Sequence, residues 1–164
     1  MNKVEIIYLL TGSNIGNKTE NLQKAKQLIG ERIGKIQKSS GYYLTQAWGN
    51  TDQDDFINQA LEVRTYHSPE QTMRVILEIE KEMGRTRTNP MEPRIIDIDI
   101  LFYGNRIIKT RDLQIPHPRF HQRNFAMVPM MEINGDYVHP ILGKAIDELY
   151  FETTDDLDVI LMEQ

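Results

Sequence analysis

The order of secondary-structure signals along the 164 residues predicts an α+β fold. Apolar runs rich in β-branched residues, typical of buried strands, alternate with two amphipathic stretches that begin at helix caps. The resulting order is strand, helix, strand, strand, helix, strand. This βαββαβ order is the ferredoxin-like pattern, in which helices pack on a mainly antiparallel sheet. The length suits one domain, residues 1–164, with its own hydrophobic core.

The first half of the chain supplies a strand, a helix and a second strand. Residues 4–10 form an apolar run typical of a buried strand, and a turn follows. Asn17 with Glu20 predicts a capping box at the start of a helix. One face of that helix is apolar and carries Leu22, Ala25, Ile29 and Ile33. Residues 35–45 then favour a strand, although the alternation of apolar and polar residues is poor.

The second half repeats the arrangement. Residues 56–63 favour a strand, and Ser68 caps a second helix that Gly84 ends. Residues 93–102 form an isoleucine-rich strand, and a short helix is expected at 145–150. The polar loop before the third strand and the basic segment before the fourth are long for so small a domain. Such loops are often functional.

Composition limits the class of protein. Hydrophobic content of 40% and charged content of 26% are typical of soluble globular proteins. The absence of cysteine excludes disulfides and thiolate sites and fits a reducing cytoplasm. The N-terminal apolar run is too short for a membrane helix. The net charge of −5 argues against nucleic-acid binding. A basic zone at 84–123 indicates either a small anionic ligand or merely an uneven solvated surface.

Two aspartates interrupt the isoleucine-rich strand. Asp97 and Asp99 should project from the same face, about 6–7 Å apart along the strand. Like charges at this spacing suit a Mg²⁺ ion that also binds phosphate oxygens, and the alternative is that they form the solvent-facing side of a strand. Arg94 shares their face by parity, and Arg85 and Arg87 lie in the preceding loop. Carboxylates beside arginines favour a metal–polyphosphate site.

His117 lies between two prolines, which fix the backbone and hold its imidazole in place. It could donate a hydrogen bond to a phosphate or be an ordinary histidine in a surface turn. The segment GSNIGN, which follows the first strand, resembles a phosphate loop only in outline. It lacks the lysine and the Walker spacing, so the chain is not a P-loop enzyme.

Aromatic and amide residues suggest a site for a flat heterocycle. Phe56 and Asn58 share a strand face, where a ring could stack and an amide could pair with its edge. Trp48 lies in the polar loop just before them. The alternative is that Phe56, Trp48 and Phe125 simply pack over the core. Glu80 falls in the apolar stripe of the second helix and therefore needs a partner, for which a nearby arginine is the candidate.

Five blocks spread over roughly the first 130 residues carry a resemblance to a known family. They are TGSNIGN, YYLTQAWGNTDQDDFIN, EKEMGRTR, PRIIDIDILFYG and IPHPRFHQRNFAMVPM. Together they resemble hydroxymethyl-dihydropterin pyrophosphokinase of folate biosynthesis. The resemblance implies that ATP gives its terminal pyrophosphoryl group to the hydroxymethyl group of 6-hydroxymethyl-7,8-dihydropterin and leaves as AMP. It also implies α/β/α layers with three mobile active-site loops, which follow Gly12, hold Trp48, and hold Arg85 and Arg87.

The resemblance also implies the roles of individual residues. Two Mg²⁺ ions would bind Asp97 and Asp99, which with Arg85 and Arg94 form the catalytic group. Nucleotide-binding groups would be Arg87, His117 and Arg123. Pterin-binding groups would be Thr45, Trp48, Phe56, Asn58 and Phe125. The partners would be small molecules, ATP and the pterin, with no nucleic acid or membrane. A cytoplasmic monomer is expected, which could associate with the next folate enzyme.

The chain departs from the family pattern at some positions. Met91 and Glu92 stand where many members have Trp-Gly, so Met91 would replace a tryptophan lid. Asp112 aligns with an arginine of some members, and nothing is transferred beyond about residue 135. Two rival functions are a nucleotidyltransferase that releases pyrophosphate and a non-catalytic ferredoxin-like binding module.

Overall fold

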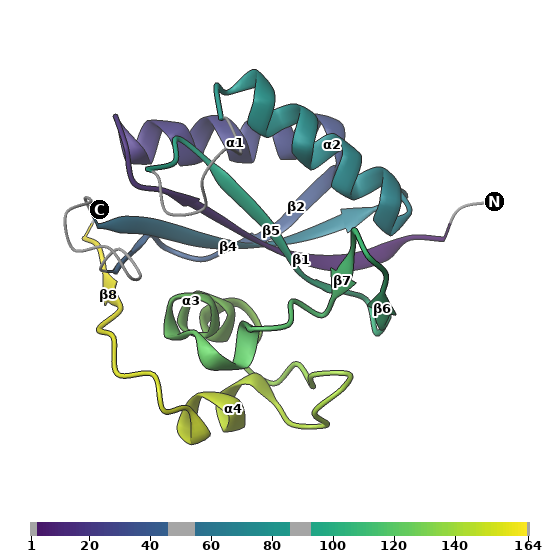
Figure 1. The fold of residues 1–164 in the computed structure, drawn as a ribbon, viewed down its shortest axis with the longest axis vertical. Coiled ribbons are helices and arrows are strands. Elements are labelled where there is room, and N and C mark those ends of the chain that lie inside the picture. The colour runs from purple at the N-terminus through teal and green to yellow at the C-terminus, as the bar shows by residue number, and fades with distance from the viewer. Residues whose placement is uncertain (1–2, 46–54, 86–92, 164) are drawn as a thin grey trace.

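The protein is an α+β structure with helices on both sides of a sheet (Figure 1). The computed structural model describes residues 3–45, 55–85 and 93–163. Helices α1 (Lys18–Arg32) and α2 (Pro69–Glu82) cover one face of the sheet, and α3 (Asn124–Asn134) and α4 (Ile146–Glu152) lie on the other side. A short 3₁₀ helix, Phe120–Gln122, precedes α3. None of the described helices combines the length and the apolar character needed to cross a membrane.

The main sheet is antiparallel at every pairing between its described strands. Its strands are β1 (Glu5–Ser13), β2 (Gly34–Ser39), β3 (Tyr43–Thr45), β4 (Phe56–Thr65), β5 (Asp97–Tyr103) and β8 (Ile160–Leu161). The order is β5-β1-β4-β3-β8, and β2 also pairs with β4. Strands β6 (Ile108–Lys109) and β7 (Gln114–Ile115) form a separate ribbon. The predicted α+β class with a mainly antiparallel sheet is confirmed.

Two apolar cores flank the sheet. One lies between the sheet and α1 and α2 and includes Ile98 and Ile100 of β5. The other contains residues of α3 and α4 together with Leu101 and Phe102 of β5. Each fully buried isoleucine contributes on the order of 1.5–3 kcal/mol. These cores fix β1, β4 and β5 rigidly, so the side chains at the strand ends have a firm support.

Local sequence signals mark the start of both long helices. The Asn17 side chain accepts a hydrogen bond from the Glu20 backbone N–H at 3.2 Å, which is one half of the predicted capping box, and Ser68 forms a complete capping box with Gln71. Gly84 follows α2 with a φ of 95°, a conformation that favours glycine. The predicted short helix near 145–150 is α4. The predicted strand at 35–45 is instead divided into β2 and β3, because residues 40–42 leave the ladder.

Helix α3 was not predicted from the sequence. It lacks a polar capping side chain, since its N-cap residue is Arg123, and it contains Pro129, which usually ends a helix. Its apolar residues also surround most of the helix rather than one stripe. Six of its residues are buried, namely Asn124, Ala126, Met127, Pro129, Met130 and Ile133. Tertiary packing therefore stabilises a helix whose local signals are weak.

Candidate active site

The paired aspartates lie at the start of the edge strand β5. Asp97 is in register with Gly12 of β1, and Asp99 is in register with Leu10. Both carboxylates are half-buried and alternate with the buried residues Ile98 and Ile100. The alternation places the two side chains on the same face, as their spacing predicts. That face is the one covered by α3, because Leu10 belongs to the core on the α3 side.

Two arginines bind the Asp97 carboxylate. Arg85 Nη1 lies 2.7 Å from Asp97 Oδ1, and Arg94 Nη1 lies 3.1 Å from Asp97 Oδ2. Arg85 Nη1 is also 2.6 Å from Glu80 Oε2, and the Arg85 side chain is only 8% exposed. Glu80 thus has the arginine partner that its place in the apolar stripe requires. Its Oε2 also accepts the Ile98 backbone N–H at 2.8 Å, which joins α2 to β5 between the two aspartates.

Arg94 reaches Asp97 from a loop and not from the strand. Strand β5 begins at Asp97, so the predicted strand parity does not apply to Arg94. Its backbone is instead held by Asn14, whose Oδ1 accepts the Arg94 N–H at 2.7 Å and whose N–H donates to Arg94 O at 3.0 Å. The turn after β1 therefore has a clear structural role, which is to position this arginine.

A negative charge on Asp99 would be poorly compensated by the surrounding protein. Burial raises the pKa of the Asp99 carboxyl well above its ordinary range, and the negative charges of Asp97 and Glu80 raise it further. Arg85 and Arg123 act in the opposite direction. A carboxyl whose pKa is shifted by burial and by neighbouring charges marks a candidate functional site.

A second group of predicted residues surrounds Asp99. His117, Arg123 and Phe125 line a small cavity together with Asp99. The Arg123 guanidinium carbon lies 5.4 Å from the centre of the Phe125 ring, within cation–π distance. Candidate residues from three separate segments, namely strand β5, the turn at His117 and the start of α3, therefore line one cavity.

His117 is a neutral hydrogen-bond donor. Burial, with a smaller effect from Arg123, lowers the pKa of His117 to about 4. Its Nδ1 lies 3.3 Å from the Arg119 backbone N–H, so Nδ1 accepts and the ring proton resides on Nε2. The His117 N–H donates to Leu101 O at 3.1 Å and holds the turn against β5. The imidazole can thus donate to an anion without first gaining a proton.

The predicted heterocycle-binding residues lie on the neighbouring strands. Thr45 is the cross-strand partner of Phe56, and Asn58 is the partner of Gly12. Since Gly12 also faces Asp97, the amide and the first aspartate belong to one row across β4, β1 and β5. Two strand spacings, or roughly 10 Å, separate their backbones. A flat molecule of pterin size bridges such a distance.

Gly12 makes room for the Asn58 amide, a role that the sequence did not reveal. Asn58 Nδ2 donates to Thr11 O at 3.1 Å, and the Asn58 side chain is buried. A Cβ atom added at Gly12 would lie 2.5 Å from Asn58 Nδ2. The sequence predicts a strand over residues 4–10 with a turn directly after it, which is wrong at Gly12, since β1 continues to Ser13. The cross-strand neighbour that demands a glycine becomes visible only from the register of β1 and β4.

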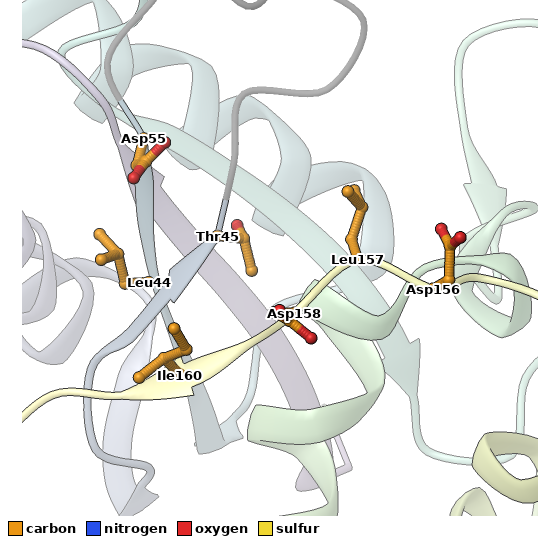
Figure 2. A pocket seen from close by; sticks show the side chains of 7 residues that line it. All are labelled: Leu44, Thr45, Asp55, Asp156, Leu157, Asp158 and Ile160. Atoms are coloured by element: carbon orange, nitrogen blue, oxygen red, sulfur yellow. The ribbon is translucent and has the colours of Figure 1, made fainter.

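A pocket of about 440 Å³ opens beside the end of β3. It is lined by Leu44, Thr45, Asp55, Asp156, Leu157, Asp158 and Ile160. Figure 2 shows the C-terminal segment with Asp156, Leu157 and Asp158 running alongside the end of β3 at Thr45. This acidic segment lies beyond the five sequence blocks, which end at residue 130, and its sequence alone predicts no role for it.

Some expected features cannot be placed. Trp48, Arg87 and Met91 lie outside the described residues, as do most of the predicted second and third loops. Within residues 3–45, 55–85 and 93–163, no three histidine, aspartate or glutamate side chains cluster as a ready-made metal site. Asp97 and Asp99 would thus need oxygen atoms from a bound molecule to complete the coordination of a cation, which is the usual arrangement for Mg²⁺.

A protein-family model described as 7,8-dihydro-6-hydroxymethylpterin-pyrophosphokinase (HPPK) matches residues 8–135. The chain belongs to this family. The HPPK match includes every site residue predicted above. The expected family, the enzyme class and the pathway, folate biosynthesis, are confirmed. HPPK enzymes use ATP.

Individual HPPK relatives support the assignment. The chain is 37% identical over 148 residues to the 2-amino-4-hydroxy-6-hydroxymethyldihydropteridine pyrophosphokinase of Aquifex aeolicus, and the match covers 90% of this chain and 92% of that protein. It is also 39% identical over 155 residues to the folic acid synthesis protein fol1 of Pneumocystis carinii. That match covers 94% of this chain but only 21% of fol1, so the chain spans about a fifth of that longer protein.

The HPPK fold is also found in solved structures. A Plasmodium falciparum HPPK-DHPS triple mutant with SDX-DHP superposes with a TM-score of 0.77 at 20% identity, covering 92% of this chain and 42% of that one. The wild-type protein with pterin and p-hydroxybenzoate gives a TM-score of 0.75. At this identity the likeness concerns the fold. It extends past residue 135, where the match to the family model ends, into the C-terminal part of the chain.

Proposed function

We propose that this chain transfers pyrophosphate from ATP to the hydroxymethyl group of 6-hydroxymethyl-7,8-dihydropterin and releases AMP, in tetrahydrofolate biosynthesis. The pterin hydroxyl oxygen bonds to the β-phosphorus, the bond from that phosphorus to the α-phosphate oxygen breaks, and the hydroxyl proton is released. The observation that carries the proposal is that paired carboxylates, cationic groups and an aromatic ring lie together. Asp97 pairs with Arg85 and Arg94. Asp99 shares a cavity with His117, Arg123 and Phe125.

Asp97 and Asp99 are proposed to hold Mg²⁺, with two ions expected. Carboxylate oxygen is the donor that Mg²⁺ prefers, and the raised pKa of Asp99 supports a site where an added cation would stabilise the ionised carboxylate. Held by Asp97 and Asp99, such an ion would supply positive charge that offsets the negative charge of the phosphate groups. Arg85 and Arg94 each donate one hydrogen bond to a different Asp97 oxygen. Each oxygen keeps a second lone pair, so a cation could be coordinated while both hydrogen bonds are retained.

The basic residues are proposed to bind the triphosphate. Arg85 and Arg94 are fixed by Glu80 and Asn14 respectively, so their positive charges are held beside the aspartates before nucleotide arrives. His117 Nε2–H and the Arg123 guanidinium lie on the Asp99 side and would donate to phosphate oxygens. Arg87 is assigned to the same group by the resemblance alone. Such preorganised donors stabilise the transferring group without a strong protein base.

The pterin is proposed to lie between Phe56 and Phe125, with Asn58 at its edge. Thr11 O holds one amide hydrogen of Asn58 and so fixes the plane of the amide. Its Oδ1 and second amide hydrogen can then pair with the donor and acceptor groups of the pyrimidine ring. Thr45, the partner of Phe56, contributes from β3. Trp48 is assigned to this site by the resemblance.

The wider assignments are also proposals. The order β5-β1-β4 with β2 and β3 beyond β4, and helices α1 and α2 between the strands, supports a ferredoxin-like core within a single domain, residues 1–164. We further propose that the chain acts in the cytoplasm as a monomer. The fused HPPK-DHPS and fol1 relatives favour association with the next folate enzyme.

The direct test is product analysis. The purified chain is incubated with ATP, Mg²⁺ and 6-hydroxymethyl-7,8-dihydropterin, and AMP, ADP and pyrophosphate are quantified. The proposal expects AMP and pterin diphosphate in equal amounts, both strictly dependent on the pterin. Formation of ADP, or of pyrophosphate as a nucleotidyltransferase would release, contradicts it.

A further inference from the structure

The C-terminal segment is tied to the residue that separates Arg123 from Phe125. Asp155 Oδ2 accepts the Asn124 backbone N–H at 2.8 Å, and the Asn124 side-chain Nδ2 donates to Asp155 O at 2.9 Å. These two contacts join residues 31 positions apart in the sequence. Asn124 is buried, and it is the first residue of α3. Its two chain neighbours, Arg123 and Phe125, both line the cavity that contains Asp99.

The backbone N–H groups at the start of helix α3 need a hydrogen-bond acceptor, and the adjacent residues of the chain do not supply one. Its N-cap residue, Arg123, has no side-chain oxygen, and its first turn contains no acidic residue. Asp155 supplies both the missing acceptor and a negative charge at the helix N-terminus. A carboxylate placed there is stabilised by the helix dipole as well as by the hydrogen bond. The capping function that is normally local is therefore provided by the opposite end of the domain.

Asp155 is itself held in a defined conformation. Its Oδ1 accepts the Leu157 backbone N–H at 3.1 Å, and its own N–H donates to Thr153 Oγ1 at 3.2 Å. Farther along, β8 pairs with β3 through Leu161 opposite Tyr43 and Ile160 opposite Leu44. In Figure 1 this segment leaves α4, passes α3 and reaches the sheet at β8. It thus links the start of α3 to the strand that ends at Thr45.

We propose that Asp155 is a positioning residue for the substrate site, acting through Asn124 on Phe125 and Arg123. This inference rests on the proposed function, in which Phe125 contacts the pterin and Arg123 the nucleotide. Loss of the carboxylate frees the first turn of α3 and lets the Phe125 ring move away from the ring that it should stack on. A shift of about 1 Å in a positioning group is enough to reduce turnover substantially.

The experiment compares Asp155→Ala and Asp155→Asn with Asp136→Asn in the complete chain. Asp136 is an exposed aspartate just beyond the other end of α3, so the control makes the same change in net charge. KM and kcat are measured for the pterin and for ATP at a temperature where all variants are folded. Pterin binding without nucleotide is followed by the fluorescence of the pterin.

Asp155→Ala is expected to raise the pterin KM and dissociation constant about tenfold, because the Phe125 ring is no longer held where it stacks on the pterin. Asp155→Asn, which keeps one acceptor oxygen, should have a smaller effect, and Asp136→Asn should match the wild type. A merely structural cap would lower the folded fraction, which reduces apparent kcat and leaves KM unchanged. In a Phe125→Ala background the Asp155→Ala effect on the pterin KM should largely disappear, because both changes act on the same contact.

A pterin KM within twofold of the wild type in folded Asp155→Ala overturns the inference. If Asp155→Ala does not fold, Asp155→Asn decides, and a pterin KM equal to that of Asp136→Asn overturns it equally. A wild-type chain that forms no AMP contradicts the proposed function itself. Normal wild-type turnover with unaffected variants contradicts only the role of Asp155.

Discussion

Arg85 lies 2.7 Å from Asp97 through the same nitrogen, Nη1, that lies 2.6 Å from Glu80. One guanidinium nitrogen thus connects a buried carboxylate of α2 to the first aspartate of β5. The arrangement fixes the arginine before substrate binds, and the Ile98 amide bound to Glu80 fixes the strand. The site is therefore preorganised around a buried ion network and does not depend on the nucleotide to assemble it.

Replacing Arg85 by alanine should damage both stability and activity. It leaves Glu80 buried without this counter-charge, and breaking a buried pair from one side costs roughly 3–5 kcal/mol. Urea denaturation should show this loss in the free energy of unfolding. Arg85→Lys keeps the charge but not the shape of the guanidinium, and should retain more stability while turnover still falls at least tenfold. An Arg85→Ala protein as stable as the wild type would show that the network is not structurally important.

Asp99→Asn should make the ligand-free protein more stable while it abolishes turnover. The folded-state pKa of Asp99 is raised by burial and by Asp97, so the folded state favours the protonated, neutral form. The favourable contribution of Asp99 to the free energy of unfolding is fully present below pH 4, which is about its pKa in the unfolded chain. This contribution is lost as the pH rises from 4 through the raised pKa of the folded state. At pH 8 the neutral asparagine should gain on the order of 1–2 kcal/mol, and at pH 4 almost nothing. Denaturation of both proteins at the two pH values measures the difference, and equal stability at pH 8 would contradict the assignment.

Gly12→Ala should weaken pterin binding selectively. The new methyl group would lie 2.5 Å from Asn58 Nδ2, so the amide must move and lose its fixed orientation. The pterin KM should rise about tenfold or more, since a misaligned amide leaves buried polar groups unpaired, whereas the ATP KM should change little. Steady-state kinetics with each substrate varied in turn provide the measurement. Equal increases in both KM values would indicate a general distortion of β1.

The elements that can be predicted from the sequence are those with strong local patterns. Capping residues marked α1 and α2, and the alternation around Asp97 and Asp99 placed both carboxylates on one face. Helix α3 was missed because Asp155, which caps it, lies 31 residues away. The close approach of Gly12 to Asn58 was missed for a similar reason, since it depends on strand register. Contacts between distant segments leave no periodic trace in a single sequence.

His117 should make the free energy of unfolding depend on pH between about 6.5 and 4. Burial lowers its folded pKa to about 4, below the unfolded value of about 6.5. The stability that it contributes is complete above pH 6.5 and is lost as pH falls from 6.5 toward 4, because the unfolded chain binds the proton first. His117→Asn should remove up to about 2–3 kcal/mol of this pH dependence. Because burial also lowers the pKa of His139 to about 4, the comparison is made between wild type and variant and not on the wild type alone.

Replacing His117 by alanine should weaken nucleotide binding. With the ring neutral above pH 6, the wild-type ATP KM should be constant from pH 6 to pH 8 as far as His117 is concerned. His117→Ala should raise the ATP KM about tenfold, as expected for loss of a hydrogen bond to a charged phosphate. An ATP KM that falls steeply as pH drops through 6.5 would instead show a histidine that binds phosphate as a cation.

The most direct test of the account is the dependence of nucleotide binding on Mg²⁺ and on the two aspartates. Calorimetric titration with α,β-methylene ATP, in which the bond to be broken is blocked, separates binding from turnover. The account predicts that Mg²⁺ raises the affinity of the wild-type chain by about a hundredfold or more, and that Asp97→Asn and Asp99→Asn each abolish most of that gain. Affinity that is the same with Mg²⁺ and with a chelator, or variants that keep the full Mg²⁺ effect, would contradict it.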